Sequence, residues 1–187
     1  QNKPVQTPLP TSTTTSSAVT SPEFPAGDTT YSMNYAGIER TYILHVPPNL
    51  PGSQKLPLVL AFHGLTLNAN EMIRISGLND QADTSGFLVV YPNGTGKNTS
   101  WNGGHCCGEA AKNNVDDIGF VRALVEELST SMNIDPQRIY VTGFSNGAIF
   151  TYRVACDLSD IIAAASPLSA TQILEDMESC KPSRPVP

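Results

Sequence analysis

The segment YVTGFSNGAIF, residues 140–150, places Ser145 midway between Gly143 and Gly147. A short apolar run precedes the serine and a helix-compatible run follows it. A serine at a sharp turn from a buried strand into a helix can act as a nucleophile, because the turn exposes its hydroxyl group and the glycines remove side chains that would collide. We therefore predict that Ser145 is a nucleophile; the alternative is a serine that only shapes a turn.

A nucleophilic serine needs hydrogen-bond donors for the oxyanion that forms when it attacks a carbonyl group. The backbone N–H of Asn146 fits this need, since the first N–H groups of a helix have no partner within it. The second donor is expected from the loop that begins at His63, where Gly64 lets the backbone turn and Leu65 or Thr66 can present its N–H group. His63 itself is predicted to be structural rather than a catalytic base.

The general base is not evident in the sequence. In proteins with this serine turn, an acidic residue and then a histidine follow the nucleophile along the chain. The three histidines here, His45, His63 and His105, all precede Ser145. His105 lies in the glycine-rich segment GGHCCG, so a role as a substitute base stays open.

The elements that would position these residues can be read from apolar patterns. A hairpin is expected around Ala36-Gly37, and strands are expected at residues 56–62, 87–92, 138–143 and 161–169. Helical patterns alternate with these runs at residues 70–83, 115–132 and 149–157, and Asp135-Pro136 is expected to break the chain. This alternation predicts an α/β fold: a mostly parallel, doubly wound sheet preceded by an antiparallel hairpin.

Composition restricts the class of protein. Residues 1–28 are rich in Ser, Thr and Pro and are predicted to form a disordered tether, with the catalytic α/β domain at residues 29–187. A start at Gln1 is typical of a secreted protein after removal of its signal, or of a boundary inside a longer protein. The net charge of -6 argues against nucleic acid as a partner, and no apolar run is long enough to predict a membrane span.

The chain has four cysteines, Cys106, Cys107, Cys156 and Cys180, which weakly favours an oxidising compartment. A bond between the adjacent Cys106 and Cys107 would be strained, so we expect each to pair elsewhere, for example with Cys156 or Cys180. Cysteine and histidine pairs do not recur at metal-ligand spacing, so we expect no metal and no cofactor.

Several segments occur together in one order: AFHGLTLNA, FLVVYPNGTG, SWNGGHCCG, VDDIGFVRAL, IDPQRIYVTGFSNGA and CDLSDIIAAASPLS. The sequence resembles the secreted α/β-hydrolases known as polyhydroxybutyrate depolymerases, feruloyl esterases and related carbohydrate esterases. The resemblance implies that Ser145 is the nucleophile of a Ser-His-Asp esterase, with Asn146 and Leu65 in the oxyanion hole. It places Trp101 and Thr66 toward the substrate cleft. Asp116 and Asp117 are expected to cap a helix and bond a loop.

The resemblance also implies a class of substrate, and it implies that the catalytic acid and base lie beyond the end of this chain. The expected substrate is a feruloyl or acetyl ester of plant polysaccharide, or a polyester such as polyhydroxybutyrate. In the family, a Pro-Val-Pro segment leads into the strand whose following loop carries the acid, and this chain stops there, at Pro187. We therefore expect a chain cut before its acid and base. The alternative is a catalytically incomplete module that binds carbohydrate or polyester.

Overall fold

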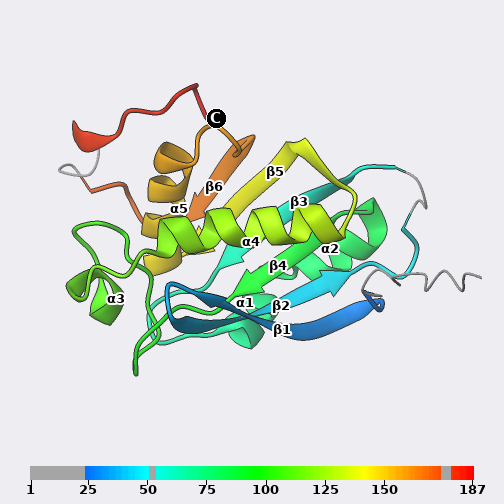
Figure 1. Ribbon diagram of the computed structural model, residues 1–187, viewed down its shortest axis with the longest axis horizontal. Coiled ribbons are helices and arrows are strands. Elements are labelled where there is room, and N and C mark those ends of the chain that lie inside the picture. Colours follow the sequence, from blue (N-terminus) through cyan, green and yellow to red (C-terminus); the bar gives the residue numbers. More distant parts are fainter. Residues whose placement is uncertain (1–23, 51–53, 174–177) are drawn as a thin grey trace, which may run out of the picture.

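The computed structural model of the 187-residue chain describes residues 24–50, 54–173 and 178–187. These residues form a six-stranded sheet with the strand order β1-β2-β4-β3-β5-β6 (Figure 1). Strands β3 to β6 pair in parallel, whereas β2 is antiparallel to both β1 and β4. The predicted mostly parallel α/β sheet with an antiparallel hairpin is confirmed. The strands are β1 (Gly27–Tyr35), β2 (Ile38–Val46), β3 (Leu56–Phe62), β4 (Leu88–Pro92), β5 (Ile134–Phe144) and β6 (Ala164–Leu168).

The hairpin between β1 and β2 turns at Ala36 and Gly37, as predicted. Both residues have positive φ angles, 51° and 78°, which a tight two-residue hairpin turn requires. The expected tether lies mostly outside the described residues, but Gly27 and Asp28 at its end belong to β1. The sheet therefore begins two residues before the predicted boundary.

Strand β5 is longer than predicted because Asp135-Pro136 does not break it. The pairing of β5 with β3 shifts here: Leu56 lies opposite Ile134, but Leu58 lies opposite Ile139. A proline, which has no N–H to donate, is tolerated where a strand bulges away from its partner. Asp135 and Pro136 therefore cause an irregularity within β5, whereas the sequence had predicted that the strand would begin after them.

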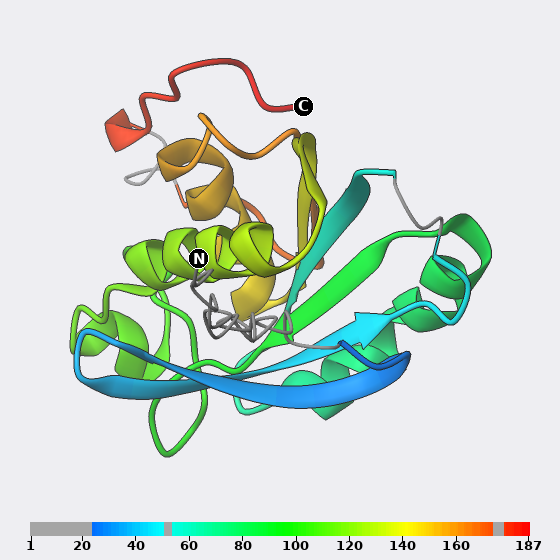
Figure 2. The same ribbon diagram turned by 45° about the vertical axis from the view of Figure 1, so that its right-hand side comes forward.

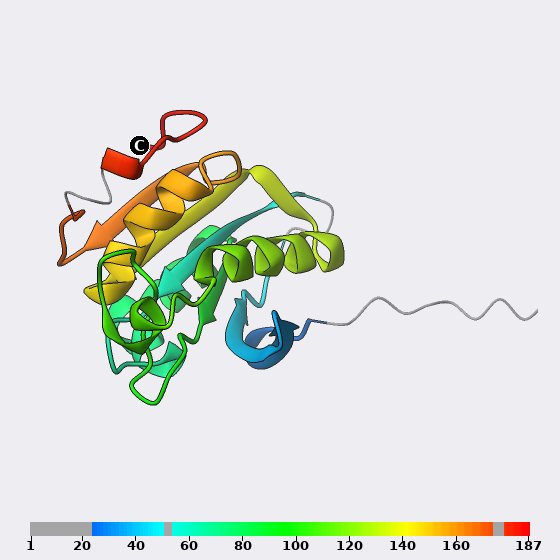
Figure 3. The ribbon, with the colours of Figure 1, turned by 60° about the vertical axis from the view of Figure 1, so that its left-hand side comes forward.

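The helices cover both faces of the sheet. Helices α4 (Asp117–Ser131) and α5 (Asn146–Asp157) lie together on one face (Figures 2 and 3), where they pack on the larger apolar cluster. Helices α1 (Ala69–Ser76) and α2 (Leu78–Ser85) pack on the smaller cluster. The single helix expected at residues 70–83 is thus two helices, because Gly77, with a φ of 61°, ends the first.

A short helix, α3 (Gly108–Lys112), follows the cysteine-containing loop. Among the described residues, none of the helices combines the length and the apolar character needed to cross a bilayer.

Candidate active site

Ser145 lies at the turn between the end of β5 and the start of α5, and it is partly exposed. Its backbone has φ 54° and ψ -117°, a conformation that residues with a side chain seldom adopt. The N–H of Ser145 donates to the carbonyl of Leu168 at 3.0 Å, and its carbonyl accepts from the N–H of Ala148 at 2.9 Å. The turn holds Ser145 at the carboxyl edge of parallel strands, the edge where such sheets place their ligands.

The two flanking glycines are required by close packing of backbone. A Cβ atom on Gly143 would collide with the carbonyl group of Gly147. A Cβ atom on Gly147 would collide with the carbonyl oxygens of Phe62 and His63, at the end of β3. The spacing of the glycines in the sequence therefore reflects contacts that bring β3, β5 and α5 together around Ser145.

Replacement of Gly147 by alanine is expected to lower the free energy of unfolding by roughly 1–3 kcal/mol, because the new methyl group meets backbone that cannot move aside. Urea unfolding followed by Trp101 fluorescence would measure the change. Gly147 lies in α5 without a positive φ angle, so only the collision acts there, whereas Gly77→Ala strains a positive φ angle in open space and measures that other cost separately. Unchanged stability of Gly147→Ala would contradict the collision.

The N–H groups expected to bind the oxyanion are those of Asn146 and of either Leu65 or Thr66, and their hydrogen bonds show which of them are unoccupied. Asn146 is the first residue of α5, so its N–H has no partner within the helix. In the other loop, the N–H of Thr66 donates to the carbonyl of Thr99 at 2.9 Å, and is thereby occupied. Within the described part of the chain, no hydrogen bond uses the N–H of Leu65. Of the two candidates in this loop, Leu65 is therefore the one whose N–H group is available to a substrate oxygen.

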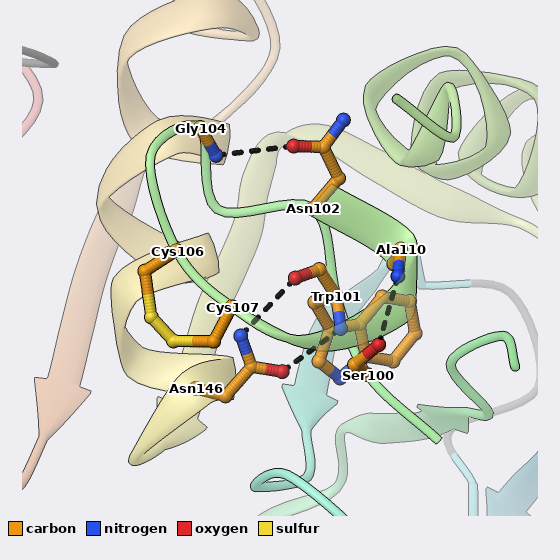
Figure 4. Close-up of a disulfide and its surroundings, with 8 residues drawn as sticks. All are labelled: Ser100, Trp101, Asn102, Gly104, Cys106, Cys107, Ala110 and Asn146. Carbon is orange, nitrogen blue, oxygen red and sulfur yellow. Dashed lines mark hydrogen bonds between the residues drawn. A yellow bond between two sulfur atoms is a disulfide. The ribbon is translucent and has the colours of Figure 1, made fainter. Parts of the chain in front are cut away.

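The side chain of Asn146 fixes the loop that contains Trp101 (Figure 4). Asn146 Oδ1 accepts from the backbone N–H of Trp101 at 2.8 Å, and Nδ2 donates to the Trp101 carbonyl at 3.1 Å. Both bonds are buried, so the amide is fully used and α5 is tied to the loop by its first residue. A role was predicted only for the backbone of Asn146, because a polar residue after the serine gives no sign in the sequence of this second role.

Trp101 does not face a cleft, contrary to expectation. Its side chain is fully buried, its ring stacks on Phe150 with centroids 5.1 Å apart, and it meets Phe62 edge-on at 5.2 Å. The indole N–H donates to the carbonyl of His63 at 3.1 Å, which satisfies the one polar group of the ring. Trp101 is a core residue because the apolar contact area of its ring outweighs the polarity of the surrounding loop.

The predicted structural role of His63 is confirmed. Its Nδ1–H donates to the carbonyl of Gly64 at 2.8 Å, and its Nε2 accepts from the N–H of Gly94 at 2.9 Å. Burial lowers the pKa of His63, so the ring is neutral near pH 7. With both nitrogen atoms engaged, this ring cannot take a proton from Ser145.

The other two histidines occupy different surroundings. His45, on β2, contacts Asp28 through Nδ1 at 2.7 Å and Asp83 through Nε2 at 3.0 Å. His105 is exposed and lines a cavity beside α5. The described geometry therefore leaves His105 as the histidine to be tested as a base.

A buried ion pair supports the loop that contains Trp101 and Asn102, and it was not predicted from the sequence. Arg40 lies 2.8 Å from Asp117, and both side chains are almost completely buried. Asp117 also accepts the N–H of Asn102 at 2.8 Å, the loop contact that was expected of it. Asp116 caps α4 by accepting the N–H of Gly119, as predicted. Burial raises the pKa of Asp117 and lowers that of Arg40, so each charge depends on the other.

The disulfide bonds differ from the expected pattern. Cys156 on α5 pairs with Cys180, with their Cα atoms 5.7 Å apart. Cys106 pairs with its neighbour Cys107, so the prediction that these two would avoid each other is wrong (Figure 4). The physical reason lies in the tertiary structure: the C-terminal segment returns to α5 and brings Cys180 to Cys156, which leaves Cys106 and Cys107 as partners of each other.

Known esterases and a depolymerase are similar in sequence to this chain. Feruloyl esterase B of Piromyces equi is 32% identical over 152 residues, which cover 79% of this chain and 27% of that protein. Poly(3-hydroxyalkanoate) depolymerase C of Paucimonas lemoignei is 33% identical over 131 residues, which cover 67% of this chain and 30% of that protein. The chain thus spans less than a third of the length of either relative.

A solved structure shows the same fold. The acetyl xylan esterase from Aspergillus awamori superimposes with a TM-score of 0.62 at 23% identity, covering 76% of this chain and 53% of that one. The sequence model of the family described as esterase PHB depolymerase matches residues 40–181. This match covers most of the chain and includes Ser145, both glycines and the loop after β3. The chain therefore belongs to the esterase PHB depolymerase family and has the α/β-hydrolase fold.

Proposed function

We propose that this chain carries the nucleophile and the oxyanion hole of a serine-dependent carboxylic-ester hydrolase. The observation that carries the proposal is the backbone of Ser145, held at φ 54° by contacts that only glycine at positions 143 and 147 permits. Strain of this kind, roughly 1–3 kcal/mol, persists where the surrounding structure enforces it and is common at active sites. A turn that merely joined a strand to a helix would not need it.

The chemistry follows from the groups around Ser145. A base removes the hydroxyl proton as the oxygen attacks the ester carbonyl, and the N–H groups of Asn146 and Leu65 stabilise the negative oxygen of the tetrahedral intermediate. The alcohol leaves with a proton returned by the base, and an acyl group remains on Ser145. Water, deprotonated by the same base, then releases the acid.

The base of this mechanism is unassigned. His63 has both ring nitrogens in hydrogen bonds, and His45 lies between Asp28 and Asp83. Of the three histidines, His105 is therefore the remaining candidate for the base; the alternative that we consider is a histidine outside these 187 positions. Ester hydrolysis by the 187-residue chain that is lost in His105→Ala would identify His105 as the base. Only residual hydrolysis by the unaltered chain, unchanged in His105→Ala, would place the base outside these positions.

The proposed substrates are feruloyl or acetyl esters of plant polysaccharide and polyesters, and the names of the relatives support both classes. A relative from Neocallimastix patriciarum, 30% identical over 151 residues, is named a bifunctional acetylxylan esterase/xylanase. We also propose that the protein is secreted, because its two disulfide bonds suit an oxidising compartment.

Covalent labelling tests the proposal directly. The 187-residue chain would be treated with a fluorophosphonate probe and digested, and the modified residue located by mass spectrometry. We expect the label on Ser145, its loss in Ser145→Ala, and its retention in Ser129→Ala, a change to an exposed serine on α4. Absence of any labelled serine would show that Ser145 is not activated within these 187 residues, and would favour for this chain a module that binds carbohydrate or polyester.

A further inference from the structure

A cavity of about 330 Å³ lies beside α5; its lining includes His105, the candidate base, but neither Ser145 nor the proposed oxyanion donors. One wall is formed by α5, through Ile149, Tyr152 and Arg153, and another by residues 102–105. Gln172 closes a third side. This volume falls in the range of small-molecule binding sites. The cavity is therefore large enough for a ligand of its own.

The cavity begins one helical turn after the nucleophile. Ile149 follows Ser145 by four residues and Arg153 follows it by eight, so both lie toward the same side of α5 as the serine. At 1.5 Å per residue, the cavity wall runs from roughly 6 to 12 Å along the helix from Ser145. A ligand in the cavity and an ester at Ser145 could thus belong to one extended molecule.

The loop wall is held rigidly. All four polar groups of Asn102 form hydrogen bonds. Its backbone N–H donates to Asp117 and its Nδ2 donates to the carbonyl of Val115, each at 2.8 Å. Its Oδ1 accepts from the N–H of Gly104 at 3.1 Å, and its carbonyl accepts from Arg153 at 3.0 Å. A wall fixed by so many bonds loses little conformational entropy when a ligand binds. The cavity is accordingly formed before a ligand arrives.

A disulfide bond and a close packing contact hold the other parts of the cavity wall. The Cys156–Cys180 disulfide lines it and fastens the C-terminal segment to α5. On the loop side, Gly103 lies so close to α5 that a Cβ atom there would be 2.8 Å from the side chain of Ile149. The loop can therefore approach the helix only with glycine at this position.

The lining side chains offer both donors and acceptors of hydrogen bonds. Arg153 donates, Asp157 accepts, and the hydroxyl of Tyr152 and the amide of Gln172 can do both. Arg153 and Asp157 form an ion pair at 3.3 Å, so their charges compensate each other. This lining suits a neutral ligand with many hydroxyl groups. A polyester offers only acceptors on an apolar chain, so it has no donor for the acceptor oxygens of Tyr152 and Gln172.

We propose that this cavity binds a neutral sugar unit of the polysaccharide that carries the ester. As a substrate site it rests on the function proposed above, and it selects polysaccharide esters over polyesters. The aromatic ring of Tyr152 and the apolar side chain of Ile149 would contact the face of the sugar ring, while the polar groups bind its hydroxyls.

Binding can be measured without any catalytic turnover. The ¹⁵N-labelled chain would be titrated with xylotriose, and in parallel with a linear trimer of 3-hydroxybutyrate, while amide chemical shifts are recorded. We expect saturable shifts from xylotriose at Gly103, Gly104 and Gln172, and none there from the ester trimer. Tyr152→Phe and Gln172→Ala should each weaken xylotriose binding about fivefold, the effect of one lost hydrogen bond. Tyr140→Phe, on the other face of the sheet, is the matched control and should not change it.

The outcomes separate this proposal from the catalytic one. Absence of xylotriose shifts at these amides, or stronger binding of the ester trimer there, overturns the sugar site even if Ser145 reacts with the fluorophosphonate. Saturable xylotriose binding that the two cavity variants weaken supports the site even if Ser145 proves inert. Binding that neither variant weakens refutes the assignment to this cavity.

Discussion

Asp117→Ala is expected to lower the free energy of unfolding by about 3–5 kcal/mol, because it leaves the buried guanidinium of Arg40 without its counter-charge. The same change leaves the N–H of Asn102 without its acceptor. Urea unfolding followed by fluorescence of Trp101, the single tryptophan, measures the loss. Trp101 is a suitable probe because it lies fully buried beside the affected loop.

The neighbouring residue provides the control for this prediction. Asp116→Ala also removes a carboxylate from the start of α4, but Asp116 is exposed, so the loss of its helix cap and of its 2.7 Å hydrogen bond from the Tyr35 hydroxyl should cost only about 1–2 kcal/mol. In the double variant Arg40→Met with Asp117→Leu, much of the stability should return, because no unpaired charge remains. Similar losses from Asp116→Ala and Asp117→Ala would show that burial of the pair is unimportant.

Removal of the Cys156–Cys180 disulfide by a double change to alanine is expected to cost roughly 3–4 kcal/mol. The two cysteines are 24 residues apart, and closing a loop of this length restricts the unfolded chain substantially. The folded state should lose little, since the bond joins α5 to a segment at the C-terminal end. Thermal and urea unfolding without reductant would measure the difference.

The adjacent pair of cysteines serves as the control here. Cys106 and Cys107 are one residue apart, so their bond closes almost no loop and restricts the unfolded chain very little. Changing both to alanine should therefore alter stability much less than loss of Cys156–Cys180. A larger loss from the adjacent pair would mean that loop closure is not the source of the stabilisation.

The sequence determined the local features of this protein. The hairpin at Ala36-Gly37, the apolar strand at residues 56–62 and the Ser145 turn follow from residue types at fixed spacing, and each lies where it was predicted. The structural role of His63 also followed, because a single histidine at a strand end commonly bonds the adjacent loop. Such features are readable because the forces that set them act between residues close together in the chain.

The tertiary structure decided the partners of residues far apart in the chain. Arg40 forms an ion pair with Asp117, the side chain of Asn146 forms hydrogen bonds with the backbone of Trp101, and Cys156 forms a disulfide with Cys180. The spacing of these residues in the sequence specifies none of these contacts. Trp101 became a core residue and not a cleft residue because aromatic rings from β3 and α5 surround it. Such pairings depend on how strands and helices stack, since burial and charge compensation are properties of the assembled fold and not of any single segment.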